Sequence, residues 1–127
     1  MSNPLHAKHY ADRAVQATVE IIENVQIARD TWRLRFACSL MAQRIVPGQF
    51  LMVRVTNCDD PLIGRPLAMY DVLRDAAGQP QAIDVVYVVK GKFTTMAHTL
   101  SRGQKVDVWG PLGNGFPPSP AAHLIMV

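Results

Sequence analysis

Strand-like alternation in short stretches, each ended by a turn signal, constrains the fold of this chain more than any other feature. The clearest stretch is TWRLRFAC (31–38), where Trp32, Leu34 and Phe36 share one face and arginines occupy the other. A period of two is typical of a half-buried β-strand. Further β-rich stretches lie at 18–28, 49–55, 61–73, 82–89 and 105–109. Six short strands with turns between them predict a small antiparallel barrel.

Turn residues indicate how these strands connect. Asp30 separates the first two strands, which predicts a hairpin, and the first strand alternates only in part, which indicates a bulge or a change of face. Pro47 and Gly48 form a turn signal before the third strand. Pro66 lies inside the fourth strand and cannot donate a ladder hydrogen bond. This strand is therefore expected at an edge, at a bulge or beside a ligand.

One segment, TTMAHTLS (94–101), has a helical pattern. Thr94 or Thr95 is a suitable N-cap, and Gly103 is a natural end signal. The sequence thus predicts one short helix before the last strand.

The composition narrows the function classes. A chain of 127 residues, of which 49% are apolar and 18% charged, suits one ordinary domain. No apolar run approaches the roughly 18 residues of a membrane span. Residues 1–16 are expected to form a flexible polar arm without a secretion signal, so we expect a cytoplasmic protein that binds no membrane. The 13 basic residues are scattered, which argues against nucleic-acid binding.

The remaining polar residues give no catalytic or metal-binding pattern. Arg33, Arg35 and Arg54 are expected on solvated outward faces of strands. Cys38 and Cys58 lack CxxC spacing, and the four histidines have no ligand companions. No metal site and no catalytic side chain are therefore expected.

Three segments suit an anionic ligand or a tight backbone. GRPLA (64–68) offers a guanidinium, which can hold a phosphate by paired hydrogen bonds, beside a proline that frees neighbouring backbone groups. KGKFTT (90–95) is a glycine turn before a helix, whose first N–H groups favour phosphate. GPLGNGF (110–116) matches neither the phosphate loop nor the dinucleotide fingerprint. Each signal alone is weak, since a solvated arginine or a glycine turn that binds only water is the commoner case.

The end of the chain has a different character. A proline-rich connector, FPPSPAA (116–122), precedes the apolar run HLIMV (123–127). Such runs are typical of buried parallel strands. We expect residues 117–127 to be a linker and the beginning of a truncated nicotinamide-binding domain, with a seventh barrel strand as the alternative.

Together and in this order, these segments resemble a known family. The RP-containing strand, VYVVKGKFTT (86–95), VDVWGPLGNGF (106–116) and PGQF (47–50) are similar to the electron-transfer subunits of dihydroorotate dehydrogenases. More broadly, they are similar to the flavin-binding domain of the ferredoxin–NAD(P)H reductase superfamily. The resemblance covers about residues 17–127. It implies an all-β fold in which residues 17–116 form a six-stranded antiparallel Greek-key barrel that holds FAD.

The resemblance also implies which residues contact FAD. In that family the arginine meets the diphosphate, the last two residues of RPLA face the isoalloxazine, and residues 86–88 lie near the ribityl and adenine parts. The family's Gly-Thr at the helix start falls on Phe93 and Thr94, whose backbone amides meet the diphosphate. The implied contacts are Arg65, Pro66, Leu67, Ala68, Val86, Tyr87, Val88, Gly91, Phe93 and Thr94.

Three of these positions depart from the family pattern. The family usually has Ser or Thr in place of Ala68, so a hydroxyl near the reactive edge of the flavin is missing. It often has arginine in place of Val88, so one cationic contact is missing. It has glycine in place of Phe93, so bulk is added near the phosphates.

The function that the resemblance implies is electron transfer in pyrimidine biosynthesis. The intact protein would pass electrons from NADH to FAD, and through a [2Fe–2S] cluster to a partner dehydrogenase subunit. The NAD site and the cluster would lie beyond residue 127, so the chain alone is expected to be inactive with NADH. A flavin reductase or hydrogenase-type subunit is an alternative within the superfamily. A cofactor-free β-barrel interaction module is the alternative from another class.

Overall fold

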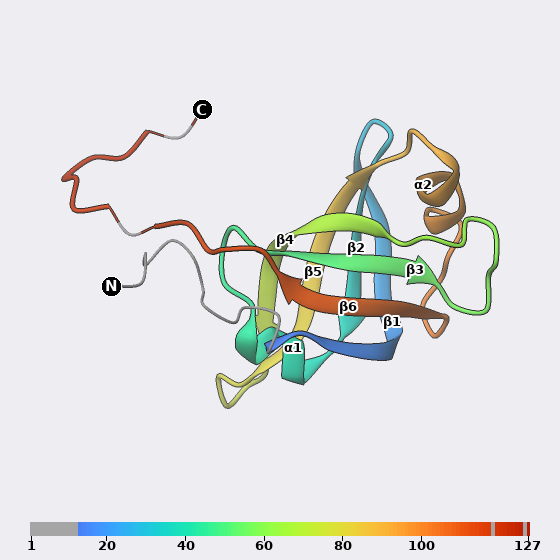
Figure 1. Ribbon diagram of the computed structural model, residues 1–127, viewed down its shortest axis with the longest axis horizontal. Coiled ribbons are helices and arrows are strands. Elements are labelled where there is room, and N and C mark those ends of the chain that lie inside the picture. The colour runs from blue at the N-terminus through green and yellow to red at the C-terminus, as the bar shows by residue number, and fades with distance from the viewer. Residues whose placement is uncertain (1–12, 118, 126) are drawn as a thin grey trace.

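A computed structural model describes residues 13–117, 119–125 and 127, which form six strands and two short helices (Figure 1). In chain order the elements are β1 (Val15–Ala28), β2 (Thr31–Ala37), α1 (Ser39–Arg44), β3 (Phe50–Val55), β4 (Arg65–Arg74), β5 (Pro80–Val88), α2 (Lys92–Ala97) and β6 (Lys105–Leu112). The strands close into an antiparallel barrel in the order β1-β2-β5-β4-β3-β6, with β6 beside β1. Because β3, β4 and β5 are neighbours and β6 returns to lie beside β3, this is the Greek-key order. The predicted fold class is confirmed.

The first hairpin forms as its turn residue predicts. Asp30 has a φ of 51°, a left-handed conformation that Asp tolerates better than most residues. The pairing of β1 with β2 shifts in register between Ile21 and Glu23, and again between Gln26 and Ala28. The incomplete alternation of β1 therefore reflects bulges, as expected.

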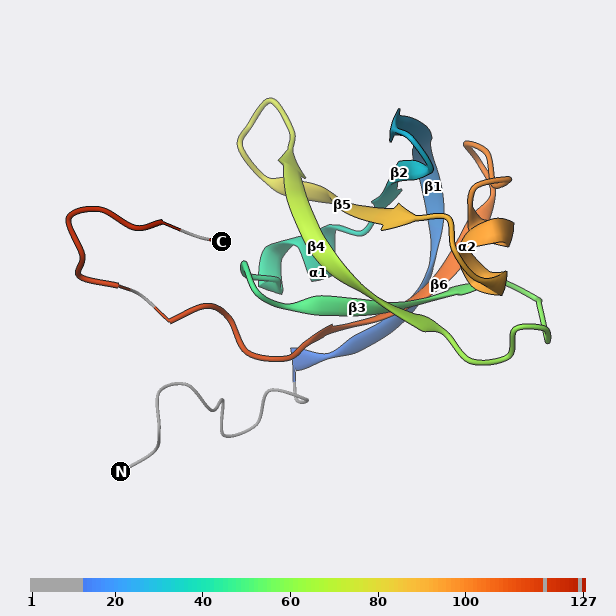
Figure 2. The same cartoon turned by 90° about the horizontal axis from the view of Figure 1, so that it is seen from above.

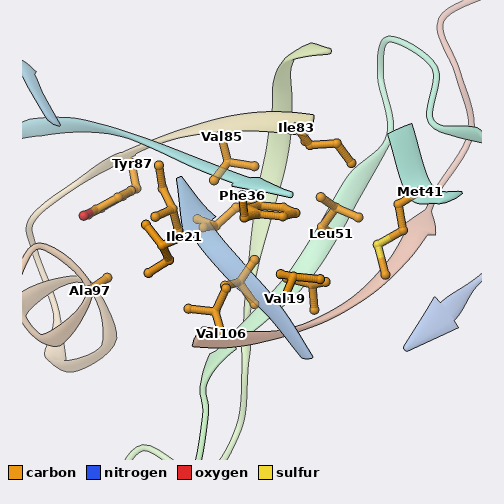
Figure 3. Packing of buried hydrophobic residues seen from close by; sticks show 14 of the residues in the cluster. Val19, Ile21, Phe36, Met41, Leu51, Ile83, Val85, Tyr87, Ala97 and Val106 are labelled. Atoms are coloured by element: carbon orange, nitrogen blue, oxygen red, sulfur yellow. The ribbon is translucent and has the colours of Figure 1, made fainter. Parts of the chain in front are cut away.

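The core fills the barrel from end to end (Figure 3). Inward residues of alternating strand positions are completely buried, among them Leu34, Phe36 and Val85. The two helices lie at opposite ends of the barrel (Figures 1 and 2). Met41 of α1 and Phe93 of α2 are both buried in the same hydrophobic cluster. Each helix therefore closes one mouth of the barrel.

Helix α1 was not among the elements that the sequence predicts. Its N-cap is Cys38, whose side chain makes no capping hydrogen bond, and its first turn contains no acidic residue. Six residues with two buried side chains, Met41 and Ala42, are too few to show a helical period. Packing on the barrel mouth, rather than local propensity, stabilises this helix.

The predicted solvated positions of Arg33 and Arg35 were wrong. Arg35 donates two hydrogen bonds to Asp84, from Nε to Oδ1 at 2.8 Å and from Nη2 to Oδ2 at 3.0 Å. Arg33 and Arg35 both also bond Glu23. Asp84 is only 2% exposed, so the outer face of β1, β2 and β5 carries a largely buried ion-pair cluster. This contact with Asp84 raises the pKa of Arg35, against the opposing effect of burial. Arg54 is paired as well, with Asp107 at 3.2 Å.

The PGQF and GPLGNGF segments pack against each other, which explains why they occur together. The Phe116 N–H donates to the Pro47 carbonyl at 3.0 Å. The Gln49 side-chain amide donates to the Gly113 carbonyl at 2.9 Å. Gly48 has a φ of +99°, and a Cβ there would lie 2.8 Å from the Phe116 nitrogen. Only glycine allows this approach.

Residues 119–125 and 127 form no strand. The alternative of a seventh barrel strand therefore finds no support in the described part of HLIMV.

Candidate functional site

An opening between β4 and β5 interrupts the barrel wall. Residues 65–68 of β4 pair with β3, but the β4–β5 ladder begins only at Met69 and Val85. On the other side, residues 86–88 of β5 pair with β2 and with no other strand among the described residues. Two strand edges therefore face each other across the opening without pairing (Figure 2). The motif residues 65–68 and 86–88, which are distant in sequence, form its two margins.

Backbone direction shows which groups line the opening. The N–H and C=O groups of one strand residue point to the same side, and successive residues alternate. The Met69 N–H bonds Gln49, on the β3 side, so the backbone groups of Pro66 and Ala68 point into the opening. The missing N–H of Pro66 therefore costs no ladder hydrogen bond. This accounts for a proline within a barrel strand.

The same reasoning applies to β5. The Val89 N–H donates to the Asp30 carbonyl at 2.7 Å, beside β2. By alternation, Tyr87 also directs its backbone toward β2, and the N–H and C=O groups of Val86 and Val88 point into the opening. Polar backbone groups on both margins are thus available to a ligand.

The side chains of the predicted site residues divide between the core and the surface. Leu67 and Tyr87 are buried in the core cluster, whereas Ala68 and Val88 are exposed. The Tyr87 hydroxyl donates to Asn24 Oδ1 at 3.0 Å, and burial raises the pKa of Tyr87 to about 12. Tyr87 is therefore a neutral, fixed core residue, and its side chain does not face the opening.

Arg65 begins β4 at the margin of the opening. It is exposed, and its guanidinium has no ion-pair or hydrogen-bond partner within the described residues. This contrasts with Arg33, Arg35 and Arg54, each held by a carboxylate. Within the part of the chain that the structure describes, Arg65 is therefore a free cation with its donors available to a ligand.

The turn before α2 completes the second margin. The Thr94 hydroxyl accepts hydrogen bonds from the N–H groups of Lys90 and Gly91, at 2.8 and 3.0 Å. The helix begins at Lys92 with Gly91 as its N-cap, so Thr94 is an internal residue and neither Thr94 nor Thr95 is the cap that the sequence predicts. The helix ends at Ala97, well before Gly103.

Phe93 does not crowd the surface of this turn. Its side chain is 3% exposed and packs in the core cluster, so the added bulk points into the barrel. A Cβ at Gly91 would meet no atom within 4 Å, which leaves the outer side of the turn open.

Other kinds of site are not indicated in the described residues. They contain no group of three or more His, Cys, Asp or Glu residues placed to hold a metal ion. Both cysteines are free. No helix among them is long and apolar enough to cross a membrane.

Comparisons with known proteins show the family to which the chain belongs. Residues 18–116 match the family described as oxidoreductase FAD-binding domain. A dihydroorotate dehydrogenase B (NAD(+)) electron transfer subunit from Geobacillus thermodenitrificans is 37% identical over 97 residues, 76% of this chain and 36% of the relative. The corresponding subunit of Fusobacterium nucleatum is 30% identical over 99 residues, 78% of this chain and 36% of its own. The chain thus spans little more than a third of the length of these relatives.

Solved structures show the same fold. The NADH-dependent reduced ferredoxin-NADP oxidoreductase, studied for flavin-based electron bifurcation, aligns with a TM-score of 0.63 at 27% identity, over 78% of this chain and 35% of its own. The ferredoxin reductase in carbazole 1,9a-dioxygenase aligns with a TM-score of 0.68 at 16% identity, over 84% of this chain and 32% of its own. With the family match extending across all six strands, the chain belongs to the oxidoreductase FAD-binding domain family.

Proposed function

We propose that this chain is the FAD-binding module of an electron-transfer subunit that passes electrons between NAD(H), FAD and a partner dehydrogenase of the dihydroorotate type. The family match supports FAD as the cofactor. The names of the relatives that are 30–38% identical support the electron-transfer role and a catalytic partner subunit. The electron donor, acceptor and partner belong to the proposal, since the chain spans only 36% of the first of these relatives.

The observation that carries the proposal is the opening between β4 and β5. Barrel strands normally pair along both edges, because an unpaired backbone group away from water is costly. Here two unpaired edges, an unpartnered arginine and an exposed turn with a glycine N-cap border the same opening. A long ligand with a diphosphate in its middle fits this donor set. The residues present therefore fit FAD.

The residues would share the work of binding as follows. Arg65 would hold the diphosphate by charge-assisted hydrogen bonds, together with the backbone amides of Phe93 and Thr94 at the start of α2. The backbone groups of Ala68, Val86 and Val88 would hydrogen-bond polar edges of the ligand. Leu67 and Tyr87, buried in the core, would fix the two strand margins in place. Bound FAD supplies the two-electron and one-electron chemistry, and this chain positions it.

The rest of the proposed protein lies outside this chain. We propose that residues 117–127 lead into a nicotinamide-binding domain, and that the NAD site and a [2Fe–2S] cluster belong to that further part. The greater length of the relatives supports this division.

A different electron acceptor is the second candidate. The similarity to the NADH-dependent reduced ferredoxin-NADP oxidoreductase, at 27% identity, favours a reductase that serves another redox protein. The FAD-binding role of this chain is the same in both cases.

Binding of FAD by the purified chain tests the proposal directly. Titration should quench or shift flavin fluorescence and give a saturating, one-to-one curve. A colourless protein that leaves the fluorescence of added FAD unchanged would contradict the proposal and favour a cofactor-free interaction module.

The isolated chain loaded with FAD is expected to resist reduction by NADH. Because the proposed hydride-donor site lies in the further domain, NADH cannot be oriented against the cofactor here. Dithionite, which needs no binding site, should bleach the same sample. Stopped-flow absorbance with stoichiometric NADH measures this, and rapid bleaching would show that the division of roles is wrong.

Ala68→Ser is expected to shift the two-electron reduction potential by about 10–30 mV, the equivalent of one hydrogen bond of about 0.5–1.5 kcal/mol. Ala68 is exposed at the opening, so the added hydroxyl can reach a bound ring without disturbing the core. Ala77→Ser, in the exposed loop between β4 and β5, is the matched control. Potentials measured against a reference dye should move only for position 68; an unchanged value would show that this residue does not face the ring.

A further inference from the structure

We infer that Lys92 is a second cationic contact for the diphosphate, and that an ion pair with Asp60 occupies the Lys92 ammonium until the diphosphate binds. This inference rests on the proposed function. Lys92 lies in the KGKFTT segment that suits an anionic ligand, but neither Lys92 nor Asp60 is among the FAD contacts that the family resemblance implies.

The two residues lie on different sides of the opening. Asp60 belongs to the loop 56–64, which joins β3 to β4 and ends directly before Arg65. Lys92 is the first residue of α2, on the side of β5. Figures 1 and 2 both show this loop beside α2. The Lys92 ammonium and the Asp60 carboxylate form an ion pair, which therefore bridges the two margins.

Among the described residues, no second side-chain hydrogen bond or ion pair reinforces the pair between Lys92 and Asp60. The side chains of Lys92 and Asp60 are 61% and 75% exposed, and neither side chain makes another hydrogen bond or ion pair within the described residues. The Asp60 backbone carbonyl accepts a hydrogen bond from the Cys58 thiol. Exposed pairs of this kind are weak and easily exchanged. In contrast, the Arg54 pair with Asp107 is reinforced by two threonine hydroxyls. The ion pair between Lys92 and Asp60 is therefore weak enough for another anion to replace Asp60.

The charge around the pair indicates what replaces the carboxylate. Arg65 and Lys90 are exposed cations near the same opening, and neither has a side-chain partner among the described residues. A carboxylate oxygen and a phosphate oxygen offer an ammonium the same kind of acceptor. A diphosphate beside Arg65 carries more negative charge than Asp60 and gains a contact with Arg65 as well. Lys92 would therefore exchange its partner when the diphosphate binds, and Asp60 would be released toward solvent.

The test is a double-mutant cycle on FAD affinity with the full chain. The variants are Asp60→Asn, Lys92→Met and both together, with Asp59→Asn as the matched control. Asp59 is the adjacent exposed carboxylate in the same loop and has no ion pair in the described structure. It therefore reports the effect of removing one negative charge without freeing Lys92. Dissociation constants come from flavin fluorescence at low salt and at about 0.5 M salt, which strongly screens exposed charges.

Asp60→Asn is expected to tighten FAD binding by about two- to fivefold at low salt, and Lys92→Met to weaken it by a similar factor. In the Lys92→Met background, the effect of Asp60→Asn should fall to that of Asp59→Asn. High salt should remove most of the difference.

The outcomes separate the two levels of the proposal. If FAD binds but Asp60→Asn acts no more strongly than Asp59→Asn, or acts equally with and without Lys92, the exchange of partners is wrong and the proposed function stands. If no variant, including wild type, binds FAD, the proposed function fails and this inference fails with it. Circular dichroism of each variant identifies any loss of fold, and Lys92→Arg, which keeps the charge, should retain the Asp60 effect.

Discussion

Arg65→Ala is expected to weaken FAD binding by about ten- to a hundredfold. A bidentate, charge-assisted contact with a diphosphate contributes about 1.5–3 kcal/mol. Arg65 is the arginine at the margin of the opening, and no carboxylate in the described structure forms an ion pair with it. Its guanidinium is therefore free for the ligand, and the full contact is lost on truncation. Fluorescence titration at fixed salt measures the change.

Two further variants identify the cause. Arg65→Lys should recover only part of the affinity, because an ammonium cannot make the paired contact. Arg102→Ala removes an exposed arginine outside the opening and should change the affinity by less than about twofold, as expected for a surface substitution. Equal affinities for wild type, Arg65→Ala and Arg65→Lys would end the assignment of Arg65 to the diphosphate.

Arg35→Met is expected to destabilise the fold by about 3–5 kcal/mol. Arg35 donates to Asp84 from Nε and Nη2, at 2.8 and 3.0 Å, and to Glu23 from Nη1 at 3.3 Å. The Asp84 side chain is 3% exposed, so removing Arg35 leaves a buried charge whose remaining cation, Arg33, has its Nε 3.9 Å away. Urea denaturation of the apoprotein measures the change.

A second substitution, at Asp84, shows whether the unpaired carboxylate causes the loss of stability in Arg35→Met. Arg35→Met combined with Asp84→Leu should recover much of the lost stability, because an apolar pair leaves no charge to desolvate. Arg33→Met, whose closest partner is the half-exposed Glu23, should cost clearly less than Arg35→Met. If the double variant is as unstable as Arg35→Met, lost packing rather than the buried carboxylate is the cause.

The sequence predicts those parts of the fold that depend on local pattern. The hairpin at Asp30, the bulged first strand and the six barrel strands all follow from alternation and turn residues. Helix α1 does not, because six residues without a side-chain cap leave no local signal. The Arg35–Asp84 pair also has none. Alternation gives the face of each residue, but the pairing of these two depends on β2 lying beside β5, which is a property of the whole topology.

For the candidate site too, the sequence predicts one part and only the structure shows the other. The family resemblance implies that residues 65–68 and 86–88 belong to one site, and the structure brings them to the two margins of one opening. The motif does not distinguish backbone from side chain. Leu67 and Tyr87 are core residues, which becomes visible only when burial and ladder direction are known. Lys92 lies within the KGKFTT segment, but its pairing with Asp60 leaves no sequence signal because it joins a loop to a helix that are far apart in sequence.

The proline in β4 has a consequence for how the protein behaves in concentrated solution. A closed barrel normally protects itself from self-association because it has no free strand edge. The opening creates two such edges, and an extended segment of another molecule could add to either of them. Pro66 removes one N–H donor from the edge of β4, so an incoming strand cannot form a continuous hydrogen-bonded ladder there. We therefore expect that replacing Pro66 lowers the solubility of the apoprotein before it lowers the stability of the fold. The change would be seen first as aggregation of the apoprotein.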